Sequence, residues 1–181
     1  MTGEQCGAVA ARLHLRPLSP DDGREIYDML QQIASNDNGF HNPVCGMSVG
    51  EYGEWLRREY GYDTGDLEDW MVPQSSYWLY DGDQPVGYGR LRHRLNAALE
   101  AHSGHIGYAI AQPYRGRGYG NAILALLLNE AARLGLKWVQ IGANADNARS
   151  NRVIRHCGGE LIRTDGSKNF YRITLKRGAQ A

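Results

Sequence analysis

The chain has 181 residues, of which 42% are hydrophobic, enough for one domain with a packed core. Its net charge is zero, from 20 basic and 20 acidic residues, which argues against a general nucleic-acid binder. The longest apolar run, residues 122–128, is far shorter than the ~20 residues of a membrane helix, and the first thirty residues lack a secretory pattern. We therefore expect a cytoplasmic protein with one domain over residues 11–177, after a disordered N-terminus of residues 1–10.

The cysteines and the charge distribution add two constraints. Cys6, Cys45 and Cys157 are too few and too widely spaced for a disulfide framework or a four-cysteine zinc site. Residues 1–75 contain 13 acidic and 5 basic residues, whereas residues 76–181 contain 7 and 15, so the halves carry charges of −8 and +8. Either one half meets an anion and the other a cation, or the two halves attract each other.

The first half of the chain predicts one strand and two helices. Residues 11–18 alternate apolar and polar side chains, as a strand does, and a serine, a proline and two acids then predict a helix over residues 20–35. Residues 36–47 are rich in Asn, Gly and Pro and predict a loop. A capping-box pattern from Ser48 to Glu51 predicts a second helix to about residue 60, and residues 63–69, with four acids, predict a solvated loop.

The second half predicts more strands. A hairpin is predicted around a Gly-Asp turn, with strands at residues 75–81 and 85–95. A connecting segment is predicted at residues 96–104, followed by a third strand at 105–111. Residues 118–135 have apolar side chains at helical spacing and predict the clearest helix. A strand at 137–143, a helix at 147–157 and a hairpin at 160–176 follow. This order predicts an α+β domain in three layers, with a mixed, largely antiparallel sheet flanked by helices and a parallel crossover at 105–143.

The most informative segment opens the helix at 118–135 and reads Arg115-Gly116-Arg117-Gly118-Tyr119-Gly120-Asn121. Its three glycines let the backbone approach a ligand, and the first amides of a helix are unpaired and attract anions. The two arginines add positive charge, so we predict a phosphate site. A Walker loop would need Gly-Lys-Ser/Thr, and a dinucleotide fingerprint would need GxGxxG with a later acid; neither pattern is present. An ordinary glycine-rich turn without a ligand is the remaining alternative.

This segment resembles the acetyl-CoA loop of the GNAT acetyltransferase superfamily, R/Q-x-x-G-x-G/A, which lies between the fourth strand and the third helix. Residues 147–159 are similar to the later helix of that family, which opens with an asparagine and here ends at Gly158-Gly159. The resemblance covers residues 75–176 most strongly and extends to a bacterial subgroup of predicted acetyltransferases. It implies acetyl-CoA as cosubstrate, no metal, and a sheet whose central parallel strands splay apart to hold the pantetheine arm.

The resemblance also implies which residues hold the cosubstrate. Backbone groups of residues 108–110 would bond the pantetheine, the amides of 115–121 would bind the pyrophosphate, and the start of the helix at 147 would reach the pantetheine. The cosubstrate-binding set is therefore Tyr108, Ala109, Ile110, Arg115, Gly116, Arg117, Gly118, Tyr119, Gly120, Asn121, Asn147 and Ser150. Three further arginines, Arg149, Arg152 and Arg155, could meet the adenosine 3′-phosphate or form a solvated helix face.

The usual catalytic residues of the family are replaced in this chain. Gly107 stands near the position of a frequent glutamate base, and Ile154 stands at that of a frequent tyrosine. His105 is our substitute for the base, with a structural role at the strand end as the alternative. Tyr108 and Tyr171 are our substitutes for the proton donor, although tyrosines in strands often belong to the core or rim. His102 and His105 alone do not make a metal site.

We therefore expect an acetyl-CoA-dependent N-acetyltransferase acting on a primary amine. Four acids, Asp63, Asp66, Glu68 and Asp69, alternate with Tyr60, Tyr62 and Trp70, which suggests a small cationic molecule or peptide as acceptor. A merely solvated acidic loop is the alternative for this segment. The alternatives for the whole protein are a catalytically silent CoA-binding module and an acyltransferase for a longer acyl chain. We expect no nucleic-acid or membrane partner, and a monomer or homodimer.

Overall fold

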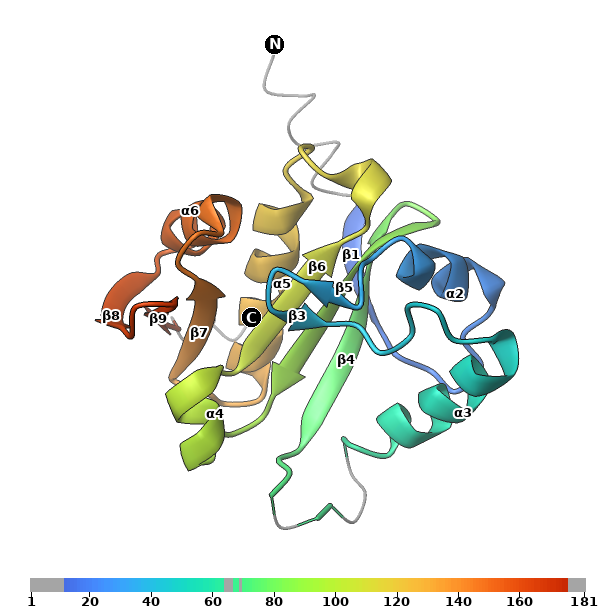
Figure 1. Cartoon of the computed structure of the whole chain (residues 1–181), viewed down its shortest axis with the longest axis horizontal. Coiled ribbons are helices and arrows are strands. Elements are labelled where there is room, and N and C mark those ends of the chain that lie inside the picture. The colour runs from blue at the N-terminus through green and yellow to red at the C-terminus, as the bar shows by residue number, and fades with distance from the viewer. Residues whose placement is uncertain (1–11, 64–66, 69, 176–181) are drawn as a thin grey trace.

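A computed structural model describes residues 12–63, 67–68 and 70–175 (Figure 1). The larger sheet has the order β1-β4-β5-β6 with every neighbouring pair antiparallel, and the smaller has the order β7-β9-β8, also antiparallel. Their strands are β1 (Leu13–Pro17), β4 (Gln74–Asp81), β5 (Gln84–Arg92), β6 (Ile106–Ile110), β7 (Trp138–Asn144), β8 (Glu160–Thr164) and β9 (Lys168–Thr174). The expected α+β class is confirmed. The predicted disordered segment, residues 1–10, lies outside the described residues.

Five α-helices accompany these sheets within the described ranges: α2 (Arg24–Gln31), α3 (Val49–Tyr60), α4 (Ala97–His102), α5 (Tyr119–Arg133) and α6 (Ala148–His156). The capping box predicted for α3 is present, with the Ser48 hydroxyl and the Glu51 carboxylate each accepting the other's backbone amide. A short 3₁₀ turn, Gln112–Tyr114, precedes α5. None of the helices that the structure describes combines the length and the apolar character needed to cross a membrane.

Several elements differ from the sequence prediction, and α2 and β5 also end earlier than expected, at Gln31 and Arg92. The loop predicted at 36–47 contains a small hairpin of β2 (Asn36–Asp37) and β3 (Phe40–His41), turned by residues with positive φ at 38 and 39. The connector predicted at 96–104 contains α4, because the Asn96 side chain accepts the amide of Leu99 and helix-forming residues follow. The helix predicted from 20 begins only at Arg24, because Asp22 is buried and its carboxylate accepts bonds from three directions instead of starting the helix.

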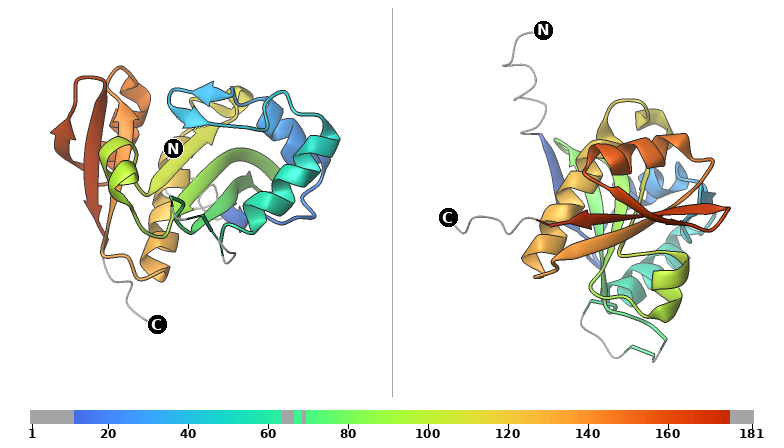
Figure 2. Two further views of the ribbon diagram at one scale, coloured as in Figure 1. Left: turned by 60° about the horizontal axis from the view of Figure 1, so that its bottom comes forward. Right: turned by 90° about the vertical axis from the view of Figure 1, so that its left-hand side faces the viewer.

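The two sheets meet where β6 and β7 run side by side and then separate. At the start of β6 the His105 amide donates to the Gln140 carbonyl at 2.7 Å. Beyond this point the strands belong to different sheets, and the left view of Figure 2 shows the smaller sheet standing apart from the larger one. Glycines permit the close approach at the junction, since a Cβ on Gly104 would lie 2.4 Å from the Gln140 carbonyl oxygen. The expected splayed central strands are thus present.

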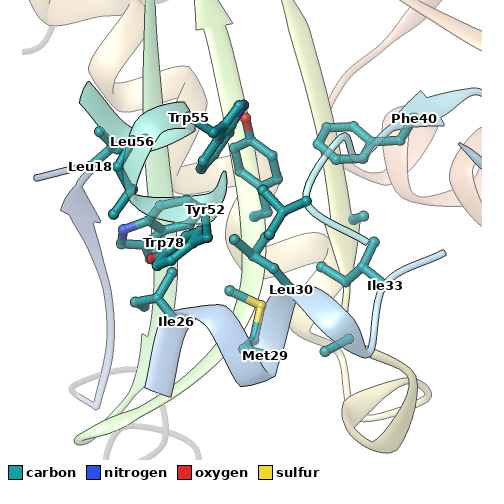
Figure 3. Close-up of a cluster of buried hydrophobic side chains, with 14 of the residues drawn as sticks. Leu18, Ile26, Met29, Leu30, Ile33, Phe40, Tyr52, Trp55, Leu56 and Trp78 are labelled. Atoms are coloured by element: carbon teal, nitrogen blue, oxygen red, sulfur yellow. The ribbon is translucent and has the colours of Figure 1, made fainter. Parts of the chain in front are cut away.

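Two apolar clusters hold the layers together. The first joins α2, α3 and the β2–β3 hairpin to one face of the larger sheet, and Figure 3 shows Trp55 and Trp78 beside Tyr52 within it. The second places α5 against the other face of the larger sheet and joins it to α6 and the smaller sheet, with Ile123, Leu127 and Tyr171 fully buried. Both clusters include side chains of β4 and β5, so helices are packed on both faces of the larger sheet.

Candidate active site

A cavity of about 140 Å³ lies in the split between β6 and β7. Gly107 and Tyr108 line it from β6, and Asn147 and Ser150 line it from the start of α6. The β2–β3 hairpin covers it, with Phe40 so close to β6 that a Cβ on Gly107 would lie 3.2 Å from its ring. A glutamate at position 107 would therefore have to displace this ring.

The backbone of β6 offers hydrogen-bonding groups to this split. Along a strand, the backbone N–H and C=O groups of successive residues point alternately to the neighbour on one side and to the other side. The odd-numbered residues of β6 point to β5: the Ala111 amide donates to the Val86 carbonyl at 3.0 Å, and the His105 carbonyl accepts the Arg92 amide at 2.8 Å. Ala109 has the same parity, so its backbone groups face β5. Tyr108 and Ile110 have the opposite parity and face β7. Of the three residues expected to bond a pantetheine, these two are oriented for it.

The glycine-rich loop lies at the far end of β6 from α4 (Figure 1). Gly116 and Gly118 have φ values of +80° and +84°, which glycine adopts without strain, and Gly118 is the N-cap of α5. The amides of residues 116–120 donate to no backbone or side-chain acceptor within the described part of the chain. A Cβ at either glycine would meet nothing within 4 Å, so the loop leaves room for an anion at these amides.

The two arginines of the loop have different environments. Arg115 donates through Nε to the Ile110 carbonyl at 2.9 Å and through Nη2 to the Asp37 carboxylate at 2.7 Å. It therefore ties the loop to the β2–β3 hairpin, and its charge is paired. The guanidinium of Arg117 lies 5.7 Å from the ring centroid of Tyr114. Both arginines were expected near a phosphate. Arg115 is paired with Asp37, whereas Arg117 has no carboxylate partner among the described residues, so its charge remains available to an anion.

The start of α6 faces Tyr108 across the split. The Asn147 side chain accepts the Ser150 amide at 3.1 Å, which caps α6, and the Ser150 hydroxyl lies 3.3 Å from the Tyr108 hydroxyl. Burial raises the pKa of Tyr108 to about 12, so its hydroxyl keeps its proton at neutral pH. The three arginines of this helix are all exposed: Arg149, Arg152 and Arg155.

His105 and Tyr171, the other catalytic candidates, line neither of the cavities described in this section. His105 is 4% exposed, its Nδ1 accepts the Gln140 amide at 3.0 Å, and burial together with the charge of Arg92 lowers its pKa to about 4. Tyr171 is fully buried and donates its hydroxyl to Asn151 at 2.6 Å. The burial and hydrogen bonds of His105 and Tyr171 favour structural roles. Of the three catalytic candidates, only Tyr108 lines the cavity between β6 and β7.

A second cavity of about 530 Å³ lies between α3, α4 and the ends of β4 and β5. Three residues line both cavities and mark the place where the two meet: His41, Arg90 and Arg92. Sequence reasoning missed all three. The two arginines are two residues apart on β5 and so share one face of the sheet, a signal that the sequence does contain. His41 lies in the segment predicted to be a loop and gave no such signal.

Arg90 is held in a buried polar network on the wall of the second cavity. It donates to the Tyr88 hydroxyl at 2.8 Å, and its Nε lies 3.8 Å from the Glu59 carboxylate. Glu59 also accepts bonds from Gln74 and Ser76, both at 3.0 Å. All three contacts are made by one oxygen of the carboxylate, Oε1, and the negative charge of Glu59 offsets the charge of Arg90.

Arg92 has no carboxylate partner in the described ranges. Its Nη1 donates to the Gly104 carbonyl at 2.8 Å and to the Ser103 hydroxyl at 3.2 Å. Burial, together with the nearby charge of Arg90, lowers the pKa of Arg92 to about 10. Arg92 is still protonated at neutral pH and places a positive charge at the junction of the two cavities.

The acidic segment predicted to hold the acceptor is only partly described. Asp63 lies 3.3 Å from the imidazole of His93, and Glu68 accepts the indole N–H of Trp70 at 2.5 Å. Positions 66 and 69 lie outside the described residues. Trp70 lines the second cavity, but neither described acid does. Among the described residues there is also no group of three metal-ligating side chains.

A sequence model of the acetyltransferase (GNAT) domain matches residues 12–160. The chain belongs to the GNAT acetyltransferase family. Its fold is similar to that of RimL, a ribosomal L7/L12 alpha-N-protein acetyltransferase in complex with coenzyme A, with a TM-score of 0.67, 18% identity, and coverage of 93% of this chain and 97% of that chain. Comparison with curated protein sequences finds no match.

Two further solved structures share the fold of this acetyltransferase domain. One is yncA from Salmonella typhimurium with its cofactor acetyl-CoA, at a TM-score of 0.60 and 14% identity, covering 93% of this chain and 97% of that one. The other is a chimera of spermidine N-acetyltransferase SpeG from Vibrio cholerae and hSSAT, at a TM-score of 0.62 and 16% identity, covering 91% and 96%. At these identities the likeness shows a common fold and no common acceptor.

Proposed function

We propose that this GNAT domain is an acetyl-CoA-dependent N-acetyltransferase that acts on a primary amine. The observation that carries the proposal is that two cavities meet at His41, Arg90 and Arg92. One cavity lies at residues 106–108 of β6, on the strand that leads to the phosphate loop, which suits the thioester end of a cosubstrate. The other opens between α3 and α4, which suits an acceptor. A nucleophile and a thioester that enter from opposite sides would meet at this junction.

The first cavity and the phosphate loop beyond β6 offer contacts for different parts of acetyl-CoA. The free amides of residues 116–120 would bind the pyrophosphate, and Arg117 adds charge beside them. The backbone groups of Tyr108 and the amide of Ile110, which face β7, would bond the pantetheine, with Asn147 and Ser150 on the opposite wall; the Ile110 carbonyl already accepts from Arg115. In this proposal the thioester would lie near Gly107, close to the residues that line both cavities.

The reaction requires two proton movements. The amine nitrogen forms a bond to the thioester carbon, the carbon–sulfur bond breaks, the nitrogen loses a proton and the thiolate gains one. The Tyr108 hydroxyl, which is protonated at neutral pH, is our proposed donor to the sulfur. His41 is our proposed acceptor from the nitrogen, since it is the imidazole that lines both cavities within the described residues.

The positive charges at the junction also favour the reactive form of the amine. An amine with an ordinary pKa near 10.4 costs about 4.6 kcal/mol to deprotonate at neutral pH. A neighbouring cation destabilises the ammonium form and lowers that pKa. Arg92, which has no carboxylate partner among the described residues, therefore helps to produce the neutral nucleophile.

A CoA-binding module without turnover is the second candidate, because Gly107 stands where the resemblance places a frequent glutamate base. A screen of primary amines with acetyl-CoA, scored by thiol release, separates the two candidates. Turnover with any amine supports the transferase, whereas tight CoA binding in calorimetry with no turnover on any amine supports the module.

Variants test the two proton-transfer residues. Tyr108→Phe and His41→Gln should each lower kcat by about 10²-fold with little change in the KM for acetyl-CoA. Tyr60→Phe and His156→Gln are matched controls, because both side chains are exposed and line neither cavity. Full kcat in either test variant would remove that residue from the mechanism.

We also infer a cytoplasmic location and a single-chain active site. The two described cysteines, Cys45 and Cys157, are free thiols, which suits a reducing compartment. One chain supplies the walls of both cavities, so a monomer contains a site and a homodimer would contain two.

A further inference from the structure

The wall of the second cavity carries an unequal set of charges. Its described charged side chains are three arginines, Arg58, Arg90 and Arg92, and one carboxylate, Glu59. Glu59 is occupied by Arg90, Gln74 and Ser76, as described above. The charges of Arg58 and Arg92 are therefore not offset by any carboxylate that the structure describes on this wall.

Arg92 is the more informative of these two residues, because burial and the neighbouring charge of Arg90 already lower its pKa. A buried cation is unfavourable unless an anion or several acceptors compensate it. Arg92 uses Nη1 for two bonds to protein oxygens, and its other two guanidinium nitrogens donate to no acceptor in the described part of the chain. An anionic group on a bound ligand would provide that compensation.

The phosphates of acetyl-CoA do not account for these arginines. Arg90 is paired with Gly107, and Arg92 donates its amide to the His105 carbonyl, both at the start of β6. The phosphate loop follows the other end of that strand. Five residues of strand separate Gly107 from Gln112, a distance of about 17 Å at about 3.4 Å per residue. The anion suited to the second cavity therefore belongs to the acceptor.

The rest of the cavity is apolar and aromatic. Its wall includes Trp55, Trp70, Met71, Val72 and Leu99. A ligand that fits this wall combines a negatively charged group for the arginines with an apolar body, and it presents its amine toward the junction with the first cavity.

We infer that the acceptor is a primary amine that also bears a carboxylate or phosphate group, of the class of amino acids and amino phosphates with a small apolar part. This inference rests on the proposed function and refines it. It differs from the cationic acceptor expected from the acidic segment, of which the two described acids, Asp63 and Glu68, do not line the cavity.

Matched pairs of amines test the inference directly. The pairs are L-phenylalanine with phenethylamine, L-leucine with isoamylamine, and phosphoethanolamine with ethanolamine, and spermidine represents a purely cationic acceptor. With saturating acetyl-CoA at low ionic strength, the acid-bearing member of at least one pair should have a kcat/KM at least about 10-fold higher than its partner. The first two pairs report on a carboxylate and the third on a phosphate. Equal use within every pair, or a preference for spermidine, would overturn the inference.

Arginine variants show whether the cavity causes the preference. Arg58→Gln should reduce the preference for the acid-bearing amine, whereas Arg57→Gln, one residue away and outside the cavity, should not. Arg92→Gln should abolish it, with Arg94→Gln as the exposed control. The KM for acetyl-CoA should stay constant in Arg57→Gln, Arg58→Gln and Arg94→Gln, none of which lines the first cavity. If Arg58→Gln and Arg57→Gln behave alike and Arg92→Gln matches Arg94→Gln, the arginines do not recognise the acceptor.

A binding measurement decides the inference even without turnover. Trp55 and Trp70 line the cavity, so ligand binding should change the tryptophan fluorescence of the CoA-bound protein. If no amine is acetylated, the proposed function fails, yet binding of an acid-bearing probe that Arg92→Gln abolishes would still support an anion-binding cavity. Failure of every acid-bearing probe to bind or react at about 10 mM would overturn it.

Discussion

Replacing His105 by Gln should remove a pH-dependent loss of stability and leave catalysis intact. The imidazole is 4% exposed, accepts the Gln140 amide at 3.0 Å through Nδ1, and meets the Trp138 ring edge-on at 5.4 Å between centroids. Burial, and to a smaller degree Arg92, lowers its pKa from the ordinary 6.5 to about 4. A glutamine oxygen can accept the same amide bond, so the strand end should remain in place.

The direction of the pH effect follows from these two pKa values. The unfolded chain binds a proton near pH 6.5, and the folded chain binds it only near pH 4. The stability contributed by the neutral imidazole is therefore complete above the upper value and is lost as the pH falls through the lower one. A difference of about 2.5 in pKa corresponds to about 3.4 kcal/mol, and about 2 kcal/mol of this is already lost at about pH 5.

Urea unfolding at about pH 8 and about pH 5 measures how much the neutral His105 imidazole contributes to the free energy of unfolding. Between these two conditions the free energy of unfolding of His105→Gln should fall by about 2 kcal/mol less than that of the wild type. His156→Gln, a substitution of an exposed imidazole, should behave like the wild type. The kcat of His105→Gln should stay within about twofold of the wild type across neutral pH, because His105 lines neither cavity.

Two results would refute this reasoning. Equal pH dependence in the wild type and His105→Gln would show that the imidazole titrates as it does in the unfolded chain. A fall in kcat of about 10²-fold with an unchanged KM for acetyl-CoA would instead assign the base to His105, as the sequence suggested.

Three further substitutions test other contacts. Gly118→Asp should weaken acetyl-CoA binding in calorimetry at least about 10-fold relative to Gly118→Asn, because only the aspartate repels a phosphate at the free amides. Equal affinities of the two variants would show that the phosphate does not bind at these amides. Asp37→Asn breaks the ion pair with Arg115 and should speed hydrogen exchange in residues 36–41, measured by mass spectrometry, whereas unchanged exchange would show that the pair does not hold the hairpin. Asp22→Asn should lower the free energy of unfolding by about 2–4 kcal/mol in urea, because the buried carboxylate accepts from Trp78 and two other donors; a loss under about 0.5 kcal/mol would contradict this.

Local patterns in the sequence determined the order of most elements and the place of the phosphate loop. The 3.6-residue spacing of apolar side chains in α5, the Ser48 capping box and the glycines at 116 and 118 each act within a few residues, so their consequences can be predicted without the rest of the chain. The small β2–β3 hairpin escaped prediction because its two strands have two residues each and are held by distant partners, such as Arg115 on Asp37.

The side chains that surround the reaction centre were decided by tertiary structure alone. Packing against Trp138 and the second apolar cluster buries His105 and Tyr171 away from both cavities, although their residue types suggested catalysis. Conversely, His41 and Arg92 come from segments far apart in the chain and meet only because the hairpin folds over β6 beside the end of β5. Sequence periodicity specifies which face of a strand a side chain occupies, but the neighbour across the split depends on how the two sheets separate, and that is a property of the whole fold.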